Sequence, residues 1–165
     1  MQVAVLTFDG FNELDSFIAA AILNRLRAQG WAATFMAKPF NVVSGCSMHL
    51  HVSLWKDGRN VFAPVDGSES EIARQAIGGM MEHLAGITLP GAPTVNSYKR
   101  IGVGAPTSGA TWAPAYATYG MNNRTQSIRI PAPGRIEIRS TDGSANPYLA
   151  AAAIRRCKTR KRFAT

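Results

Sequence analysis

Two histidines and a serine at alternate positions form the first group of side chains that could do chemistry. His49, His51 and Ser53 occur in the stretch MHLHVSLW, with aliphatic residues between them. Alternate side chains of an extended strand point to the same face of a sheet, so these three residues are predicted to share one face. Imidazole is a good ligand for divalent metals. The stretch therefore predicts either a binding face or the ordinary solvent-facing side of a strand.

Two later stretches, QSIRI and RIEIRS, show the same alternation with charged residues. Arg129 alternates with isoleucines in the first, and Arg135, Glu137 and Arg139 alternate with isoleucines in the second. An antiparallel sheet with one wet face produces this pattern without any function. A solvent face usually carries Lys, Glu and Thr, however, whereas these faces carry His, Arg and a single Glu. This composition favours a binding site over a plain solvent face.

Arginine is abundant around that glutamate. Arg100 in NSYKR and Arg124 in NNRT add to the arginines of the predicted strands. The planar guanidinium binds carboxylate and phosphate through paired hydrogen bonds that Lys cannot reproduce. A surplus of guanidinium groups suits a substrate that brings its own negative charge, and a phosphoryl group or an amino-acid carboxylate would both qualify.

The bulk composition is that of an ordinary globular domain. The 165 residues are 46% hydrophobic and 17% charged, which is enough for one domain with a real core. No apolar run is long enough to span a bilayer, and the N-terminus MQVAVLTFDG has no basic leader, so a cytoplasmic location is expected. The two cysteines, Cys46 and Cys157, are expected to be free thiols.

Most of the positive charge lies at the C-terminal end. The net charge is +8, and the six basic residues of RRCKTRKR leave only +2 for the rest of the chain. We interpret residues 155–165 as a solvated basic tail, with a nucleic-acid-binding module as the alternative. No aromatic residues alternate with these charges, which argues against single-strand binding.

The hydrophobic pattern of residues 1–30 differs from that of the remaining chain and predicts a single βα unit. QVAVLTF reads as a buried strand, and Leu14, Ile18, Ile22 and Leu26 give the following helix one apolar stripe, with Gly30 at its C-cap. The stretch VAVLTFDGFNELDSF resembles the opening of the PfpI-type protease and class I glutamine amidotransferase-like superfamily. No matching strand–Cys–helix elbow follows, so we interpret this unit as scaffold.

From residue 31 the sequence predicts short strands, glycine-rich turns and two helices, which together form an α+β domain over residues 31–154. The first helix is predicted near Ser68, which has capping-box spacing to Glu71. Its apolar stripe is predicted at Ile72, Ala76, Met80 and Leu84. The second helix is predicted to start with Asn146 as its N-cap and Pro147 in its first turn.

Five motifs in this region resemble the catalytic domain of the glutamine synthetase family. They are ATFMAKPF, MHLHVSLW, PTVNSYKR, NNRTQSIRIP and RIEIRSTDGSANPYLAAAA, and they occur in the family's order over residues 32–154. The resemblance implies a truncated core of that fold, a curved antiparallel sheet with helices packed against it. It also implies ring-shaped homo-oligomers, with sites between subunits.

The resemblance also implies a role for individual residues. It assigns His49 and Glu137 to Mg²⁺ or Mn²⁺ and His51, Ser53 and Arg129 to ATP. It assigns Gly45, Arg100, Arg124 and Arg139 to glutamate and the transferring phosphoryl group, with Arg100 and Arg124 as catalytic residues. The implied reaction is a two-step ligation: ATP phosphorylates the γ-carboxylate of glutamate, and ammonia or a small amine then attacks the acyl phosphate.

Two departures from the family pattern leave alternatives open. Ser44 replaces an Asn expected at the substrate, and Trp112 stands where the family has a Glu that helps deprotonate ammonium. An indole cannot take a proton but can form a wall for an alkylammonium ion. The variant loop resembles that of the type III-like subgroup, which implies a γ-glutamylmethylamide-type ligase as one alternative. The other alternative is a non-catalytic fragment with weak ATP or metal binding, because two ligands cannot hold a pair of hard cations well.

Overall fold

The computed structural model describes residues 25–31, 34–41, 45–101 and 113–157 of a chain that divides into two compact units, Met1–Phe35 and Met36–Thr165. In the first unit, residues 25–28 are helical and Gly30 follows with a φ of 75°. The Trp31 N–H donates to the Leu26 carbonyl at 2.9 Å, the bond that closes a Schellman motif. The predicted C-cap is therefore confirmed. The predicted strand and helix start lie outside the described residues.

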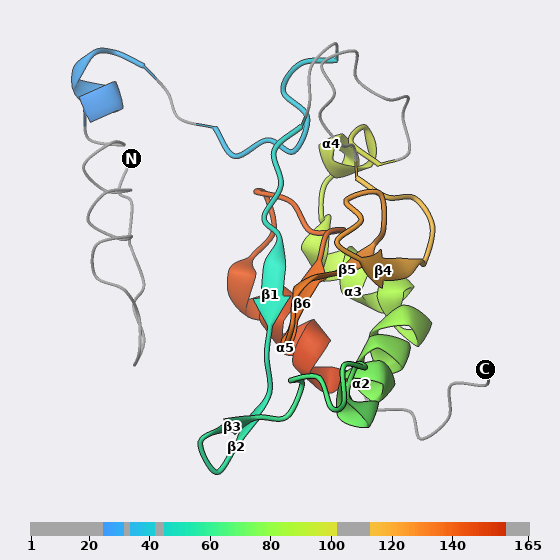
Figure 1. Cartoon of the computed structure of the whole chain (residues 1–165). Helices are drawn as coiled ribbons and strands as arrows, with labels where there is room; N and C mark the ends of the chain where they lie inside the picture. The colour runs from blue at the N-terminus through green and yellow to red at the C-terminus, as the bar shows by residue number, and fades with distance from the viewer. Residues whose placement is uncertain (1–24, 32–33, 42–44, 102–112, 158–165) are drawn as a thin grey trace. The chain divides into compact units, whose positions relative to one another are not determined.

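The second unit is built from short strands and helices (Figure 1). In chain order they are β1 (Leu50–Val52), β2 (Trp55–Lys56), β3 (Arg59–Asn60), α2 (Glu71–Glu82), α3 (Leu84–Gly91), α4 (Val95–Tyr98), β4 (Tyr119–Met121), β5 (Ile128–Ala132), β6 (Arg135–Ile138) and α5 (Pro147–Arg156). The three alternating stretches each contain a strand, although β1 includes only His51 of the three polar residues predicted to share its face. Helices α3 and α4 were not predicted.

Four of these strands form one sheet in the order β1-β6-β5-β4. Strand β6 pairs antiparallel with both β1 and β5, while β4 pairs parallel with β5. The predicted α+β class is confirmed, and the sheet is antiparallel except for its β4 edge. Pro131 lies where the β5–β6 register shifts, which fits a residue that cannot donate a ladder hydrogen bond.

The core lies between the apolar face of this sheet and the helices. The isoleucines of β5 and β6 that alternate with the charged residues are at most 5% exposed, and Figure 1 shows α2, α3 and α5 packed on this side of the sheet. The core cluster contains Ile128, Ile130, Ile136 and Ile138 of the sheet with Ile77, Met80, Ile87 and Ile154 of the helices. Burial of the isoleucines turns Arg129 and Glu137 to the opposite face.

The start of helix α2 differs from its prediction. Its N-cap is Ser70, whose hydroxyl accepts a hydrogen bond from the Ala73 N–H at 3.1 Å. Ser68 is not the cap, because its backbone pairs with Val65 in a short bridge before the helix begins. The buried stripe also shifts: Ile72 is 41% exposed, so the prediction that it belongs to the stripe was wrong.

Helix α5 begins as predicted. The Asn146 side chain accepts hydrogen bonds from the N–H groups of Tyr148 and Leu149, and Pro147 occupies the first helical position. Proline fits there because its missing N–H would have no partner inside the helix. The cap therefore follows from the local sequence alone.

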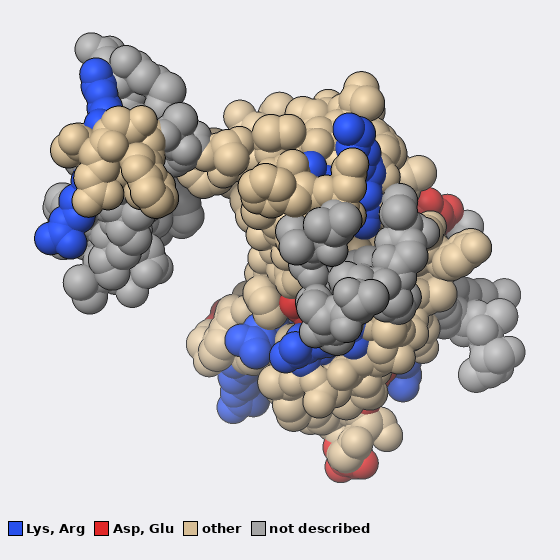
Figure 2. All heavy atoms as spheres, turned by 90° about the horizontal axis from the view of Figure 1, so that it is seen from above, with Lys and Arg blue, Asp and Glu red and all other residues tan. Residues whose placement is uncertain are grey.

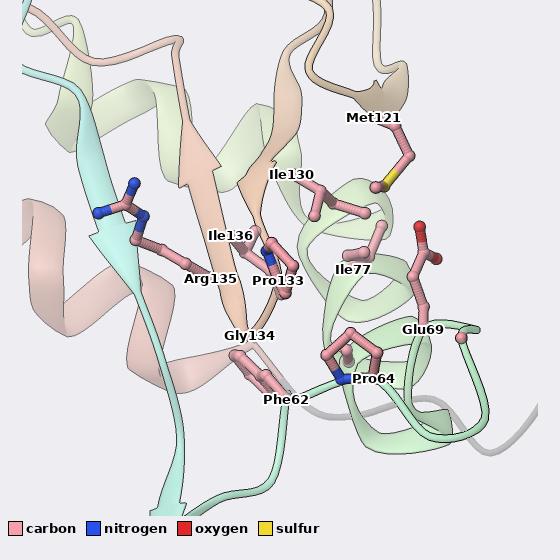
Figure 3. A pocket seen from close by; sticks show the side chains of 12 residues that line it. Phe62, Pro64, Glu69, Ile77, Met121, Ile130, Pro133, Gly134, Arg135 and Ile136 are labelled. Carbon is pink, nitrogen blue, oxygen red and sulfur yellow. The ribbon is translucent and has the colours of Figure 1, made fainter.

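A small apolar cavity of about 60 Å³ lies between α2 and the turn that joins β5 to β6 (Figure 3). Phe62, Ile77, Ile130 and Ile136 contribute to its lining, and none of the predicted site residues does. It belongs to the helix side of the sheet. The cavity is therefore separate from the predicted site residues.

Candidate functional site

Three predicted site residues lie side by side on the polar face of the sheet. Glu137 on β6 is paired in register with His51 on β1 and with Arg129 on β5. The side chains of residues paired in this way lie close together on one face. Sheet pairing therefore brings together residues that are up to 86 positions apart in the chain.

Glu137 is the centre of this cluster. It is 3% exposed. Its Oε2 accepts a hydrogen bond from Arg129 at 2.9 Å, and its Oε1 accepts one from Arg139 at 3.0 Å. The Nδ1 of His49 lies 3.0 Å from the same Oε1, while the Nε2 of His51 lies 3.9 Å away. His49 and Glu137, the two residues that the resemblance assigns to a metal, thus lie together among guanidinium groups.

Two groups beside His49 Nδ1 compete to set which ring nitrogen carries the proton. Glu137 Oε1 lies 3.0 Å away and only accepts hydrogen bonds, whereas the Arg139 guanidinium lies 3.4 Å away and only donates. The shorter contact, to the carboxylate, favours Nδ1 as the donor. In a neutral imidazole the other nitrogen, Nε2, then keeps its lone pair. Carboxylates orient metal-binding histidines in this way, so Glu137 positions His49 in the same manner.

The charges of the cluster perturb the pKa values of its members. Burial, the largest cause, and the charge of Arg139 together lower the pKa of His49 to about 4, against the opposing effect of Glu137. Burial raises the pKa of Glu137, but the hydrogen bond from Arg129 and the charge of Arg139 outweigh it, so the pKa lies below the usual value. At neutral pH the imidazole is therefore neutral and the carboxylate ionised.

We expect His49 to titrate near pH 4 and to make the protein less stable in mild acid. The pKa of about 4 in the folded state lies below the ordinary histidine value of 6.5, so between these values the unfolded state binds more protons. The free energy of unfolding should therefore fall as pH falls from 6.5 to 4. Proton NMR of the imidazole and urea unfolding at pH 7 and pH 5 would measure both effects.

The matched variant for this test is His49→Asn, which retains an N–H donor for Glu137 but cannot take up a proton. It should flatten the decline in stability between pH 6.5 and 4. An imidazole midpoint near 6.5 in the wild type would contradict the buried, positively surrounded environment of His49.

The described cluster does not by itself fit a divalent cation. The two guanidinium groups of Arg129 and Arg139 face one carboxylate, so with a neutral His49 the net charge is +1. Both oxygens of Glu137 already accept hydrogen bonds. Among the described residues, no group of three or more His, Cys, Asp or Glu side chains is placed to hold a metal ion. The arrangement suits an anion, and His49 Nε2 could contribute to a metal site only together with further carboxylates.

The side chain of Arg139 is hydrogen-bonded to the backbone of Arg124. Arg139 is 5% exposed, and its Nε donates to the Arg124 carbonyl at 3.1 Å. The side chain of Arg124 is exposed. Arg124 thus supports the buried guanidinium through its backbone while its own side chain faces solvent.

Arg100 is as buried as Arg139 but contacts the backbone instead of Glu137. It is 5% exposed and donates hydrogen bonds to the backbone carbonyls of Arg139, Ser140 and Thr141 at 3.2, 3.3 and 2.8 Å. The structure therefore shows Arg100 holding the chain that follows β6. It does not bring the Arg100 guanidinium into contact with Glu137.

Two further predicted residues lie at opposite ends of the site region. Gly45 packs against Arg100: a Cβ there would lie 3.0 Å from two of its methylene carbons and 2.4 Å from the Ala37 carbonyl oxygen. Ser53 is exposed, and its hydroxyl accepts a hydrogen bond from the indole N–H of Trp55 at 3.0 Å. Neither residue touches Glu137 in any of the contacts described.

Two residues of the site region were not predicted. Trp55 continues the alternation of positions 49, 51 and 53, and its indole is 61% exposed, so extending the pattern by one step could have found it. Asn122 accepts a hydrogen bond from Arg129. Asn122 follows β4, the parallel edge strand, and no sequence pattern places that residue beside Arg129.

Some predictions fall outside the described residues. Ser44, Trp112 and the basic tail from residue 158 onward belong to this group, so the predictions about them stay predictions.

Figure 2 shows several basic side chains close together near the middle of the view from above. In the described part of the chain, no helix combines the length and apolar character needed to cross a bilayer.

Comparison with known proteins gives a consistent result. Residues 17–158 match the family described as "Glutamine synthetase, catalytic domain". The chain is 43% identical over 143 residues to a glutamine synthetase of Rhizobium leguminosarum bv. phaseoli, covering 84% of this chain and 33% of that protein. It is 43% identical over 129 residues to a glutamate–methylamine ligase of Methyloversatilis universalis, covering 76% and 29%. The chain thus spans about a third of the length of these relatives.

Solved structures agree with the sequence matches. A GmaS/ADP complex superposes with a TM-score of 0.71 at 39% identity, covering 90% of this chain and 37% of that one. GmaS without ligand superposes with a TM-score of 0.67 at 38% identity, covering 86% and 32%. The motifs, the sheet and these comparisons agree, and the chain belongs to the glutamine synthetase catalytic-domain family.

Proposed function

We propose that this chain is part of an ATP-dependent ligase that joins ammonia or a small amine to the γ-carboxylate of glutamate. The observation that carries the proposal is the buried Glu137, bound by Arg129, Arg139 and His49 on the polar face of the sheet. Family membership supports the ligase class, and the similarity to a GmaS/ADP complex supports a nucleotide substrate.

The phosphates of ATP would lie against the guanidinium groups of this cluster. Its net positive charge favours a polyphosphate, and the partial burial of Arg129 strengthens the attraction relative to open solvent. Glu137 holds both arginines in place, so their N–H groups need little reorganisation as charge moves to the transferred phosphoryl group. The γ-carboxylate oxygen of glutamate attacks the terminal phosphorus and releases ADP. The amine then displaces phosphate from the acyl phosphate.

The strand β1 and the residues after it would bind the nucleoside part of ATP. His51, Ser53 and Trp55 alternate along the extended chain, and four residues of such a chain span about 13 Å. The exposed indole of Trp55 offers a flat surface on which a base can stack, and its N–H bond to Ser53 restrains its orientation. Phosphates at the cluster and a base near Trp55 would fit one extended nucleotide.

The glutamate side is assigned to Gly45, Arg100, Arg124 and Arg139. The exposed side chain of Arg124 is free to reach a carboxylate or phosphoryl group, and its backbone is tied to Arg139. The close approach of Gly45 to Ala37 and Arg100 leaves its own backbone as the group that can face a substrate. The family resemblance assigns a divalent metal, Mg²⁺ or Mn²⁺, to His49 and Glu137, where it would neutralise phosphate charge. Because both oxygens of Glu137 accept hydrogen bonds from arginines, His49 Nε2 is the described atom that would contact the metal, and further carboxylates would have to complete the site.

Methylamine is the second candidate acceptor. One of the similar proteins is a glutamate–methylamine ligase, and the similar solved structures carry the name GmaS. The glutamine synthetases from Rhizobium leguminosarum and Pyrococcus furiosus, at 43% and 49% identity, support ammonia as the acceptor. The acceptor is therefore a question for a direct assay.

The test measures ADP release by the purified chain with ATP, glutamate and Mg²⁺ or Mn²⁺, in separate reactions with ammonia, methylamine and ethylamine. Turnover with any amine supports the ligase, and the fastest amine identifies the acceptor. ADP binding by calorimetry without turnover would identify the chain as a non-catalytic nucleotide-binding part. The absence of both binding and turnover would refute the proposal for this chain.

We expect Trp55→Ala to weaken ADP binding about tenfold, because base stacking on an aromatic ring contributes roughly 1–3 kcal/mol. Trp55→Phe should retain most of the affinity. Trp31→Ala is the matched control, since Trp31 is exposed to a similar extent, 68% against 61% for Trp55, but lies in the first unit. Calorimetry should show unchanged ADP affinity for that control, and equal losses in both alanine variants would refute a role for Trp55 in particular.

A further inference from the structure

The side chain of Asn96, on helix α4, clamps the backbone of a residue far away in the sequence. Its Oδ1 accepts a hydrogen bond from the Lys38 N–H at 2.6 Å, and its Nδ2 donates to the Lys38 carbonyl at 2.8 Å. The amide thereby satisfies both backbone groups of Lys38, as a paired strand would. These two bonds tie residue 38 to α4.

Helix α4 is itself well anchored. The Thr94 hydroxyl accepts from the Ser97 N–H while the Ser97 hydroxyl accepts from the Thr94 N–H, which makes a complete capping box. Ser97 is fully buried, and its hydroxyl lies 3.4 Å from that of Ser144. The clamp on Lys38 therefore starts from a fixed point in the domain.

Contacts continue from Lys38 to Gly45. Ala37 is fully buried, and its carbonyl accepts a hydrogen bond from the Cys46 N–H at 2.8 Å. That same oxygen lies against Gly45, where a Cβ would approach it to 2.4 Å. The position of residues 37 and 38 thus decides where Gly45 and Cys46 lie.

From this chain of contacts we infer that Asn96 is a positioning residue for Gly45 and thereby for the amino-acid substrate. The inference rests on the proposed function, which assigns Gly45 to glutamate. Asn96 would not touch the substrate, because its amide is engaged by Lys38 on both sides. The cluster around Glu137 is built on β1, β5 and β6, whereas Asn96 lies on helix α4. Nucleotide binding at that cluster should therefore not depend on Asn96.

The experiment compares three variants. Asn96→Ala removes both bonds to Lys38, and Asn96→Asp keeps the acceptor for the Lys38 N–H but loses the donor. Asn60→Ala is the matched control, since Asn60 also makes two side-chain bonds to backbone, with the Phe62 N–H and the Gly134 carbonyl, each at 2.9 Å. These bonds support the turn between β5 and β6 instead of Gly45.

Two readouts separate positioning from a general loss of stability. Hydrogen exchange of the Cys46 amide should become about tenfold faster in Asn96→Ala, because its acceptor Ala37 is released, and it should stay unchanged in Asn60→Ala. Calorimetry should show about tenfold weaker glutamate binding in Asn96→Ala, with ADP affinity within about twofold of the wild type. Asn96→Asp should lie between the wild type and Asn96→Ala in both measurements.

Equal Cys46 exchange in Asn96→Ala and Asn60→Ala would overturn the inference. Faster exchange with unchanged glutamate affinity would also overturn it, because Asn96 would then hold Gly45 without serving the substrate. A wild-type chain that binds no glutamate would refute the proposed function and the substrate role of Asn96 together. That failure is recognised separately, because Cys46 exchange is measured without any ligand.

Discussion

Replacing Glu137 with alanine is expected to lower the free energy of unfolding by about 3–5 kcal/mol. The carboxylate is 3% exposed and accepts hydrogen bonds from Arg129 and Arg139, which would be left as two adjacent guanidinium charges without their shared partner. Like charges at this separation repel, and burial prevents water from fully replacing the carboxylate. Urea unfolding at pH 7 measures the loss directly.

Glu71→Ala is the matched control for this prediction. Glu71 also pairs with an arginine, Arg74, at 2.6 Å, but both side chains are largely exposed on α2. Exposed ion pairs contribute little to stability, so this variant should unfold almost as the wild type does. If Glu71→Ala and Glu137→Ala lowered the free energy of unfolding by similar amounts, burial of the Glu137 cluster would not be the cause of the destabilisation.

Replacing Gly45 with alanine is expected to lower the free energy of unfolding by about 1–3 kcal/mol and to weaken glutamate binding. The new Cβ would lie 2.4 Å from the Ala37 carbonyl oxygen and 3.0 Å from methylene carbons of Arg100. The closest neighbour is a backbone atom, which cannot swing aside as a side chain can, so the chain on one side must move. Urea unfolding and glutamate calorimetry measure the two effects.

Gly86→Ala provides a control of opposite sign. Gly86 lies in helix α3, and a Cβ there meets no atom within 4 Å. Alanine favours a helix over glycine by roughly 0.5–1 kcal/mol, so this variant should be slightly more stable than the wild type. A stabilised Gly45→Ala would contradict the close approach of Ala37 and Arg100 to Gly45.

Local patterns predicted several elements of the fold correctly. The alternation of isoleucine with charged residues predicted β5 and β6, because burial of one face requires a period of two. Asn146 and Pro147 predicted the start of α5, since capping depends on a few neighbouring residues. The Ser68 cap was wrong because two serines in SESE compete, and the bridge between Val65 and Ser68 leaves Ser70 as the cap.

The candidate site was predicted less completely. Alternation placed His49, Glu137 and Arg129 on polar faces, and the family resemblance assigned them to metal and ATP. Asn122 could not be predicted, because it reaches Arg129 from the end of β4, an edge strand whose parallel pairing with β5 was not predicted. The bonds from Arg100 to three backbone carbonyls likewise depend on where the chain after β6 lies.

The order of the amino acids is enough to show which residues alternate, where helix α5 starts and which family the motifs resemble, because propensity and capping act over a few residues. The folded chain adds that His49 is a neutral donor to Glu137, that two arginines share this one carboxylate, and that Asn96 holds Lys38. These properties arise from burial and from contacts between segments up to about ninety residues apart. Sheet pairing and helix packing set those contacts, and neither is encoded in the spacing of neighbouring residues.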